Sequence, residues 1–490
     1  MENTREFTEN MKEYIRRMLS ELQIEQEKKP LRFVQQFGYL TYIRLFVESQ
    51  KNEKLQEYFP YAGFPMEWTR GDEPMEGQQR IWQLQYQMQY CGSIVEEGHF
   101  MEQAKIVENA AWMEVLCKFI DWLSDYCRWG GGMPSCYGTA MEEMIRQIDE
   151  MGNSDIFLMP EPLTGLLVQL GTICLGEKSK ANKTIRVWNP ACRTGEFLAA
   201  LHRSCEQWNL TGTEGNKDQA VIAQMLQFYH GVREGIIQMQ DPLEGSADGA
   251  YHLVVSNPPV GELAAALQER FPIVTRKIQL QYLQMILKSL EEDGFGIVII
   301  NEGTLFKFEA EMKVRQSIME TCRLHGIISL PAGAFMPYTM SKMSILIFEK
   351  KKVDAADQLV FFYELENPGY TMDRKRELRE ESQIPELLQC WNERKNLEEQ
   401  WRISLQNGEQ RNQWENPVPQ IWKQEHCWFA DRATIQKNDY NFTVGRYKPW
   451  SEDKKKEEES PLQMLRQLEA MEQETLKQMR ELIEMVENYG

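Results

Sequence analysis

The sequence contains no long apolar run that could cross a membrane. No stretch of about 18 apolar residues occurs in its 490 residues, so we expect no membrane span. The first residues are polar and charged and lack the apolar centre of a signal peptide, which predicts a cytoplasmic protein.

Metal-ligand spacings are absent as well. Ten cysteines are scattered along the chain without a Cys-x-x-Cys pair, and the six histidines complete no zinc-ligand spacing with them. We therefore expect reduced, mostly buried thiols and no metal site.

Positively charged residues are fewer than negatively charged ones. The chain has 55 Lys and Arg against 74 Asp and Glu, a net charge of -19. This balance argues against a protein that binds nucleic acid without a partner, because contacts to phosphates need Lys and Arg. If DNA is the substrate, either a local basic groove or a partner must supply most of the affinity.

The first part of the chain is predicted to be helical. Apolar residues recur at helical spacing through residues 1–150, which indicates an α-helical N-terminal domain. The Gly- and Pro-containing segment 128–138 is expected to end this helical layer.

The pattern changes near residue 155, where short apolar runs begin to alternate with helical segments. This alternation predicts an α/β domain with a mostly parallel sheet, extending over 151–450. Ligands of such sheets bind beyond the carboxyl ends of the strands. Strands are predicted at 184–190, 210–215, 251–259, 295–303 and 342–350.

Past residue 355 the alternation weakens. The charged segment 373–382 is expected to form a solvated helix face, and 451–459 a polar linker. The last stretch, 460–490, opens with Ser-Pro, a helix-start signal. Its apolar seam follows a seven-residue spacing through Leu468, Thr475, Leu482 and Tyr489. We therefore expect a linker and C-terminal helix over 451–490, and favour packing on a partner subunit over packing within the chain.

The strongest chemical signal is Asn257-Pro258-Pro259, which directly follows an apolar strand. About 60 residues upstream, the glycine-containing turn 189–195 joins a predicted strand to a helix. A tight turn before a helix N-terminus can cradle a nucleotide-like ligand, because backbone N–H groups point outward there. The plainer interpretation of Asn257 is an ordinary turn residue.

Two carboxylates end the next predicted strands. Glu214 follows the turn by about 20 residues, where an acidic side chain can hold ribose hydroxyls. Asp241 ends the following strand, where its carboxylate could face an adenine. Both could instead be solvated loop residues.

Together these residues resemble the N6-adenine DNA methyltransferases, most closely the modification subunit of type I restriction–modification systems. The resemblance covers roughly residues 140–490. It implies a Rossmann-like domain that uses S-adenosylmethionine to methylate double-stranded DNA. It also implies a DNA specificity subunit as a partner, with a restriction subunit as a further candidate.

The family's cofactor loop, Asp-Pro-x-Cys-Gly-Ser/Thr-Gly, is similar to the segment from Asn189 to Gly195. A Phe-x-x-Pro segment that closes over the cofactor in the family is similar to the segment from Phe157 to Pro160, although Phe157 could equally be simple core. The resemblance thus implies these cofactor-binding residues: Phe157, Pro160, Asn189, Pro190, Ala191, Gly195, Glu214 and Asp241.

The family's catalytic Asn-Pro-Pro-Phe/Tyr corresponds to Asn257, Pro258, Pro259 and Val260. The exocyclic amine of adenine is a poor nucleophile because its lone pair is delocalised. The side chain of Asn257 and the carbonyl of Pro258 can accept its N–H bonds and aim the lone pair at the methyl group, so positioning does most of the work. The target base first leaves the duplex, usually to stack on an aromatic side chain.

Four positions depart from the family. Val260 cannot stack on a base, which is worth about 1–3 kcal/mol. Arg193 replaces a glycine that allows a positive φ, and is expected to block the cofactor or distort the turn. Asn189 replaces an aspartate and removes a charge at the cofactor's amino-acid end. His252 stands where the family commonly has Asp, and is interpreted as a surface or strand-end histidine.

Three hypotheses remain open from the sequence. The first is an active adenine methyltransferase. The second is a degenerate methyltransferase-fold scaffold, with a closed cofactor pocket, that binds a specificity subunit or another partner in a defence complex. The third is a methyltransferase with another acceptor, such as a protein glutamine side chain. Binding of S-adenosylmethionine separates the first from the second.

Overall fold

A computed structural model describes most of the chain. The described residues are 2–56, 58–59, 66–96, 99–102, 104–130, 134–152, 156–180, 184–232, 235–244, 248–263, 268–351, 359–406, 426–448 and 479. Met1–Glu409 and Pro417–Tyr447 form one compact unit, and Gln410–Asn416 and Lys448–Gly490 form a second. Apart from Met479, the predicted linker and C-terminal helix at 451–490 lie outside the described residues.

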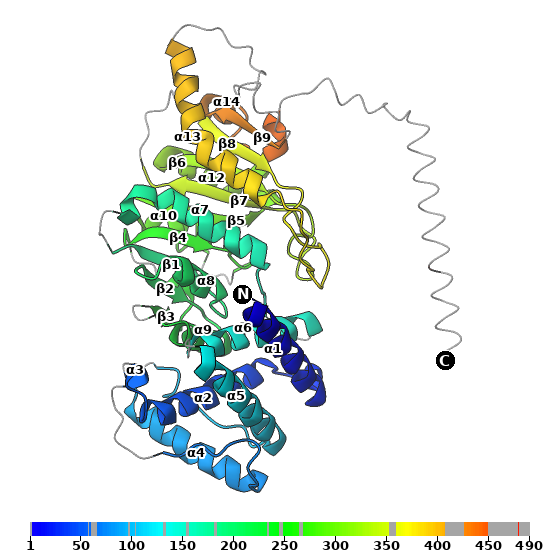
Figure 1. The fold of residues 1–490 in the computed structure, drawn as a ribbon. Helices are drawn as coiled ribbons and strands as arrows, with labels where there is room; N and C mark the ends of the chain where they lie inside the picture. The colour runs from blue at the N-terminus through cyan, green and yellow to red at the C-terminus, as the bar shows by residue number, and fades with distance from the viewer. Residues whose placement is uncertain are drawn as a thin grey trace. The chain divides into compact units, whose positions relative to one another are not determined.

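The N-terminal region is helical, as the sequence predicts (Figure 1). Its helices are α1 (Glu2–Glu21), α2 (Leu31–Ser49), α3 (Glu53–Gln56), α4 (Gly77–Ile94), α5 (Ala110–Gly130) and α6 (Ser135–Met151), with the short helix η1 (Ile24–Gln26) after α1. The expectation that 128–138 ends the helical layer is wrong. This segment separates α5 from α6, and α6 still packs against α1 and α2 because it buries an apolar face there.

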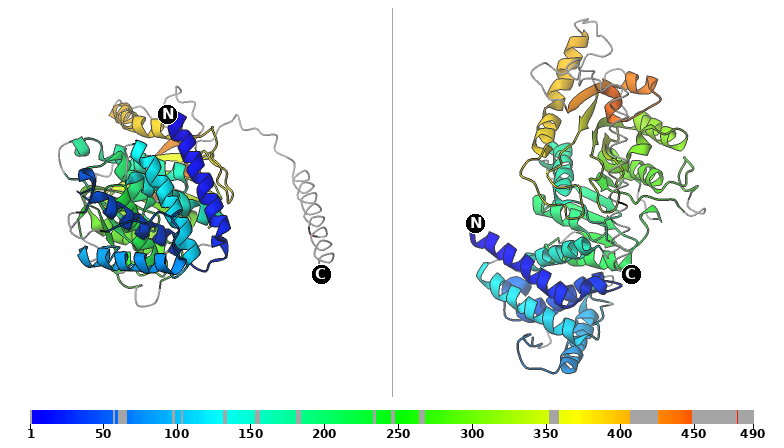
Figure 2. Two further views of the ribbon diagram at one scale, coloured as in Figure 1. Left: turned by 60° about the horizontal axis from the view of Figure 1, so that its bottom comes forward. Right: turned by 90° about the vertical axis from the view of Figure 1, so that its right-hand side faces the viewer.

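The helical region shares its core with α9 (Lys217–Tyr229), a helix of the α/β part. In Figure 2 the blue N-terminal helices lie against the green elements of that part. The backbones of α2 and α9 approach closely. A Cβ added at Gly38 would lie 2.5 Å from Sδ of Met225. Gln35 also donates a hydrogen bond from Nε2 to the backbone carbonyl of Asp218, at 3.1 Å. The N-terminal helices are therefore anchored directly on the sheet's own helical layer. The domain boundary near residue 150 stays a prediction.

Within the described residues, nine strands form one mixed sheet in the order β3-β2-β1-β4-β5-β7-β6-β8-β9. Strands β3 to β5 pair in parallel, and β7 is antiparallel to both of its neighbours. The strands are β1 (Arg186–Pro190), β2 (Asn209–Thr213), β3 (Ile236–Gln238), β4 (Tyr251–Ser256), β5 (Leu290–Asn301), β6 (Arg323–Ser329), β7 (Met343–Glu349), β8 (Leu359–Glu364) and β9 (Cys427–Asp431). The predicted α/β architecture is confirmed.

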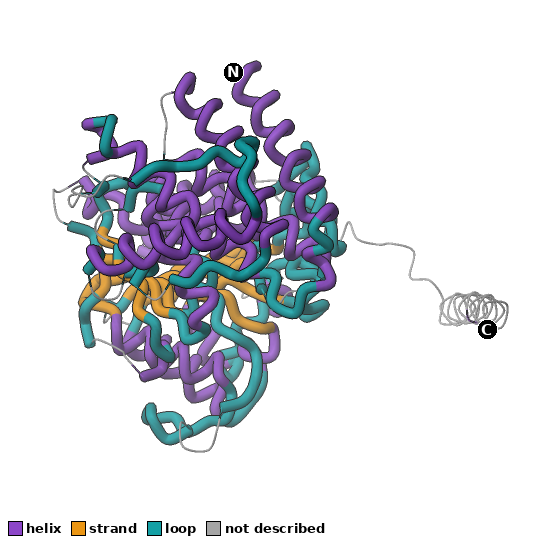
Figure 3. The backbone as a smooth tube through the Cα atoms, turned by 90° about the horizontal axis from the view of Figure 1, so that it is seen from below, coloured by secondary structure: helices purple, strands orange, loops and turns teal. Residues whose placement is uncertain are grey.

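Helices lie on both faces of these strands (Figure 3). They are α7 (Glu161–Lys180), α8 (Glu196–Ser204), α9, α10 (Ile278–Ser289), α11 (Glu302–Phe306), α12 (Ala310–Thr321), α13 (Ile384–Gln406) and α14 (Arg432–Lys437), with the short helices η2 (Pro242–Glu244) and η5 (Val444–Tyr447). Because both faces are covered, the central strands are buried along almost their whole length, which is why they read as unbroken apolar runs.

The strand order reverses between β1 and β4. The chain runs outward from β1 through β2 to β3, and then returns to place β4 on the other side of β1. The connections leaving the carboxyl ends of β1 and β4 therefore diverge at a switch point, called the crevice below, which is the usual ligand position in such sheets. Both motifs singled out in the sequence lie at this crevice, since 189–195 follows β1 and 257–260 follows β4.

Two expectations for other segments are wrong. Residues 373–382 form bends, and a β-bridge pairs Leu378 with Tyr370 within the same loop, because the chain folds on itself there before α13 begins. The expectation of reduced thiols fails for one pair, since a disulfide joins Cys127 and Cys136. The short connection between α5 and α6 brings these two cysteines together, with Cα atoms 6.8 Å apart.

None of the described helices is long and apolar enough to cross a membrane. In the same part of the chain, no three His, Cys, Asp or Glu side chains gather in a way that could hold a metal ion.

Gly195 immediately precedes α8 and allows a test of the fold. Its φ is 88°, and a Cβ added there would lie 2.9 Å from Cβ of Ala223 in α9. We expect Gly195→Ala to lower stability by about 1–3 kcal/mol, from backbone strain and the forced contact. Gly165 in α7 is the matched control. It has open space around it, so Gly165→Ala should stabilise the helix by about 0.5–1 kcal/mol. Thermal melting measures both, and equal melting temperatures for the two variants would contradict the argument.

Candidate functional site

The loop after β1 makes a tight, partly left-handed turn into α8. Positive φ angles occur at Ala191 (59°), Arg193 (56°) and Gly195 (88°). This conformation costs an L-residue about 1–2 kcal/mol. Arg193 nevertheless adopts the left-handed φ expected of the glycine that it replaces, and α8 begins at Glu196. The predicted distortion of the turn is therefore not observed.

Glu214, at the end of β2, holds this turn in place. Its Oε2 accepts the backbone N–H of Arg193 at 2.9 Å, and its Oε1 accepts that of Asn216 at 2.8 Å. A carboxylate has about four acceptor sites, so capacity remains for further donors. The half-buried Glu214 can thus fix the loop and still accept ribose hydroxyls.

Asp241 follows β3 at the same edge of the sheet. Its Oδ1 accepts the backbone N–H of Leu243 at 2.9 Å. Tyr282 of α10 is buried nearby. Its pKa is raised, first by burial and then by the negative charges of Asp241 and Glu214. No sequence signal marks Tyr282, because a tyrosine in an apolar helix looks like ordinary core. The structure therefore brings Glu214, Asp241 and Tyr282 together.

Two side-chain hydrogen bonds tie the ends of β1 and β4. The amide of Asn189 donates to the backbone carbonyl of Val255 at 2.6 Å. The hydroxyl of Ser256 donates to the backbone carbonyl of Pro190 at 2.9 Å. The predicted cofactor loop and the Asn-Pro-Pro segment are thus fixed to each other, and Asn189 acts here as a neutral structural link.

Asn257 differs from the structural asparagines of this protein. Its side chain is buried, with 8% of the residue exposed, and its Nδ2 has no hydrogen-bond partner. Leaving a buried donor unpaired costs about 1–3 kcal/mol. Asn189 and Asn216, in contrast, use their side chains to link strands or cap a helix. An unpaired amide at a strand end points to a ligand that would pair with it.

The remaining residues of the segment line its outer side. Pro258 is buried, Pro259 is half-buried, and the side chain of Val260 is 66% exposed. Val260 therefore stands at the surface of the crevice, in the position where the family places its aromatic residue.

The segment from Phe157 to Pro160 closes one side of the crevice. The ring of Phe157 stacks on Tyr338 at 4.4 Å, and Cζ of Arg193 lies 4.3 Å from the centre of the Phe157 ring. Burial lowers the pKa of the Arg193 guanidinium. Phe157 is thus in contact with the cofactor loop. Pro160 is buried and starts α7, where its carbonyl accepts the N–H of Leu163 at 3.0 Å.

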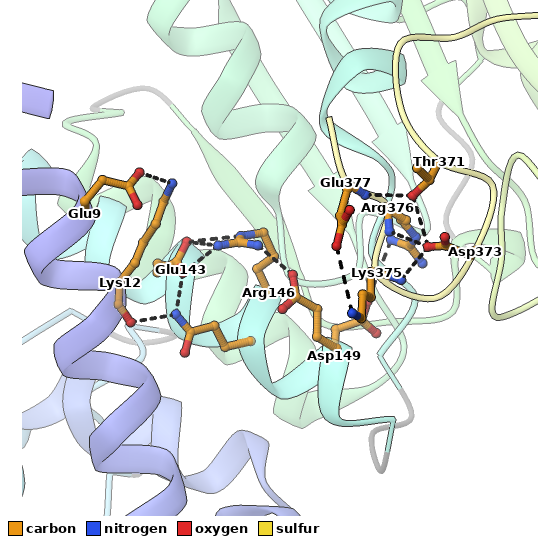
Figure 4. Close-up of polar contacts among 12 residues, drawn as sticks. Glu9, Lys12, Glu143, Arg146, Asp149, Thr371, Asp373, Lys375, Arg376 and Glu377 are labelled. Carbon is orange, nitrogen blue, oxygen red and sulfur yellow. Dashed lines mark hydrogen bonds and ion pairs between the residues drawn. The ribbon is translucent and has the colours of Figure 1, made fainter. Parts of the chain in front are cut away.

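Tyr338 is a second residue that the sequence analysis missed. Its hydroxyl donates to Asp149 of α6 and accepts the backbone N–H of Leu158 at 2.8 Å. Arg376 lies over the Tyr338 ring at 4.9 Å and 3.7 Å from the Asp149 carboxylate. Figure 4 shows Asp149 at the end of α6 facing the loop that carries Arg376. These contacts connect the helical region to the aromatic wall of the crevice.

His252 lies away from the crevice, at the start of β4. Its Nδ1 accepts the backbone N–H of Arg186 at 3.1 Å, and its Nε2 is 3.2 Å from Glu291. This placement confirms the interpretation of a strand-end histidine.

A mixed sheet with a reversal at β1 and β4, an antiparallel β7 between β5 and β6, and acidic side chains after β2 and β3 is the fold of an S-adenosylmethionine-dependent methyltransferase. Residues 135–458 match the family described as N-6 DNA Methylase. Because this match covers well over half of the sequence, the chain belongs to that family.

A relative of known family supports the same assignment. The methylase subunit of the type I restriction enzyme EcoEI from Escherichia coli is 29% identical over 250 residues, which cover 46% of this chain and 48% of that protein. The match thus spans about half the length of this relative.

Solved structures support the fold. The methyltransferase subunit of a type I restriction-modification system from Streptococcus thermophilus aligns with a TM-score of 0.65 and 16% identity, over 90% of this chain and 99% of that one. A chain from a study of complex assembly in a type I system aligns with a TM-score of 0.62 and 19% identity, over 97% and 98%. At these identities the likeness shows the fold alone.

Glu196, at the start of α8, gives the site a testable pH dependence. Burial raises the pKa of its carboxyl to about 7, against a hydrogen bond from Thr194 that lowers it. A carboxyl group with a raised pKa contributes its full stability at pH values below its pKa in the unfolded chain. This contribution is lost as the pH rises through its pKa in the folded protein. We expect wild-type stability to fall between pH 5 and pH 8 by about 1–3 kcal/mol more than in Glu196→Gln. Melting curves across this range measure the difference, and parallel pH profiles would contradict it.

Proposed function

We propose that this chain transfers a methyl group from S-adenosylmethionine to the N6 amine of adenine in DNA, as the modification subunit of a type I-like restriction–modification system. The observation that carries the proposal is the unpaired, buried amide of Asn257, which the hydrogen bond from Ser256 to Pro190 holds beside the cofactor loop. Family membership supports the same reaction.

The residues of the crevice fit the adenosine part of the cofactor. Glu214 retains acceptor capacity for ribose hydroxyls, and Asp241 ends the neighbouring strand, where it can face the adenine amine. Pro190, Ala191 and Gly195 shape the turn beneath them. When bound, S-adenosylmethionine supplies an activated methyl group on a sulfonium centre. The protein's part is to hold this group and the acceptor in line.

Asn257 and Pro258 act on the acceptor. The side-chain oxygen of Asn257 and the backbone carbonyl of Pro258 accept the two N–H bonds of the adenine amine, which directs the nitrogen lone pair toward the methyl group. The new N–C bond would form as the donor's S–C bond breaks, with S-adenosylhomocysteine as the leaving group and the surplus amine proton passing to water. The reaction then needs no separate acid or nucleophile. Val260 borders the extruded base without an aromatic face, so capture of the base is weaker than with Phe or Tyr.

The net charge of -19 shapes the proposal for partners. DNA binding gains its affinity from phosphate contacts, which this chain is poorly equipped to make. We therefore propose that a specificity subunit brings double-stranded DNA to the site. A restriction subunit and the cytoplasmic location stay predictions.

A scaffold without activity is the second candidate, and one observation favours it. Arg193 brings a cation and a Cβ into the turn where the family has glycine. This candidate predicts that purified protein binds no S-adenosylmethionine. Calorimetric titration decides between the two, because micromolar binding is expected only of the enzyme.

Asn257→Ala tests the chemistry. We expect N6-methyladenine formation to fall roughly 100-fold or more, while the free energy of unfolding does not fall through a lost hydrogen bond, because Nδ2 has no partner to lose. Mass spectrometry of DNA incubated with the chain, its specificity subunit and S-adenosylmethionine measures the product.

Asn189→Ala is the matched control for stability. This variant loses the bond to Val255 and should be destabilised by about 1 kcal/mol. Normal methylation by Asn257→Ala, or methyl incorporation into protein and not into DNA, would show that the proposed function is wrong.

Val260→Phe tests the base-capture step. An added aromatic face should tighten binding of a duplex that contains the target adenine about 10-fold, since stacking is worth about 1–3 kcal/mol per base. Fluorescence of 2-aminopurine at the target position reports the extruded base, with Val274→Phe as a control at another exposed valine. An equal response of the two variants would argue against Val260 as the stacking position.

A further inference from the structure

The cofactor loop holds a cation that lacks a carboxylate partner. Among the described residues, the Arg193 guanidinium takes part in no ion pair. Its recorded side-chain contact is the face of Phe157. Glu214 is close and accepts the backbone N–H of Arg193, but it forms no ion pair with the Arg193 guanidinium. Five N–H donors in a planar fork thus stand at the crevice without an anionic acceptor.

This guanidinium is held in a defined position. Phe157, on which it lies, stacks on Tyr338 at 4.4 Å. The Tyr338 hydroxyl is fixed between Asp149 and the backbone of Leu158. At the other end, the hydrogen bond to Glu214 fixes the Arg193 backbone. A donor group that is ordered before binding loses little entropy when a ligand arrives.

Two carboxylates, those of Glu214 and Glu196, act on the Arg193 guanidinium through space, and neither forms an ion pair with it among the described residues. Asn189, at the carboxyl end of β1, is neutral, and its amide is already bound to Val255. The loop therefore presents a positive charge on the side of the crevice formed by Phe157. A carboxylate accepts two parallel hydrogen bonds from a guanidinium. The cofactor's ammonium and sulfonium groups cannot offer this geometry.

We propose that Arg193 is a specificity-determining residue that binds the α-carboxylate of the cofactor's amino-acid part. This inference rests on the proposed function, because it assumes an adenosyl ligand in the crevice. It assigns to Arg193 a role in binding the cofactor and not in blocking its site. It also predicts that S-adenosylhomocysteine, which lacks the sulfonium charge, binds more tightly than S-adenosylmethionine, since the guanidinium repels a second cation nearby.

The experiment is calorimetric titration of the full chain with four probes: S-adenosylmethionine, S-adenosylhomocysteine, decarboxylated S-adenosylmethionine and methylthioadenosine. The variants are Arg193→Gln, Arg193→Gly and, as a control, Arg203→Gln, which removes an arginine that is paired with Glu142 at 2.9 Å. Arg193→Gly keeps a residue suited to the positive φ, so one variant is expected to fold. Melting temperatures check folding in every case.

We expect wild type to bind S-adenosylmethionine about 10- to 100-fold more tightly than its decarboxylated form, the usual range for a lost charge-assisted hydrogen bond. Arg193→Gln and Arg193→Gly should lose most of this preference and leave methylthioadenosine binding unchanged. Arg203→Gln should behave like wild type. A general structural defect would weaken all four probes alike, so the preference itself reports the proposed contact.

Two results overturn the inference. Tighter binding of S-adenosylmethionine by Arg193→Gly would show that Arg193 blocks the site, and an unchanged preference in both variants would show that it does not touch the carboxylate. Either leaves the proposed function standing, because the wild type still binds an adenosyl ligand. Binding of no probe by the wild type or by either variant would refute the proposed function and this inference together.

Discussion

The joint between the ends of β1 and β4 is the constraint on which the site depends. Two short hydrogen bonds, from Asn189 to Val255 and from Ser256 to Pro190, lock the two strand ends together where the chain order of the sheet reverses. The turn after β1 and the Asn-Pro-Pro segment after β4 leave this joint in different directions. Because the joint is rigid, a ligand on one loop and an acceptor on the other would meet at a fixed separation, as a transfer reaction requires.

A second layer of contacts gives the crevice its wall. Asp149 at the end of α6 positions Tyr338, Tyr338 supports Phe157, and Phe157 supports the guanidinium of Arg193. The helical region thus does more than cover the sheet. It packs on α9 through a shared core and reaches the cofactor loop through this row of side chains. A partner that binds the helical region would therefore act on a surface physically connected to the site.

The sequence predicted the central strands well, because burial on both faces leaves unbroken apolar runs such as those of β4 and β7. It failed past residue 355. There, β8 and β9 lie more than 60 residues apart in the chain and pair only through the sheet. The charged segment 373–382 was predicted to be helical because it resembles a solvated helix face. Its backbone N–H groups instead bond to the side chain of Asp373 and to the backbone carbonyl of Gly369.

The sequence by itself determined the α/β class and the positions of Glu214, Asp241 and Asn257, because strand ends and tight turns leave local signals in the residue order. Only the tertiary structure decided which side chains surround them. Tyr282, Tyr338 and Asp149 come from distant elements and carry no local motif. The tertiary structure also gave Arg193 a defined position against Phe157, from which an anchoring role can be inferred. The physical reason is that periodicity records burial, while contacts between residues far apart in the chain depend on how the layers pack.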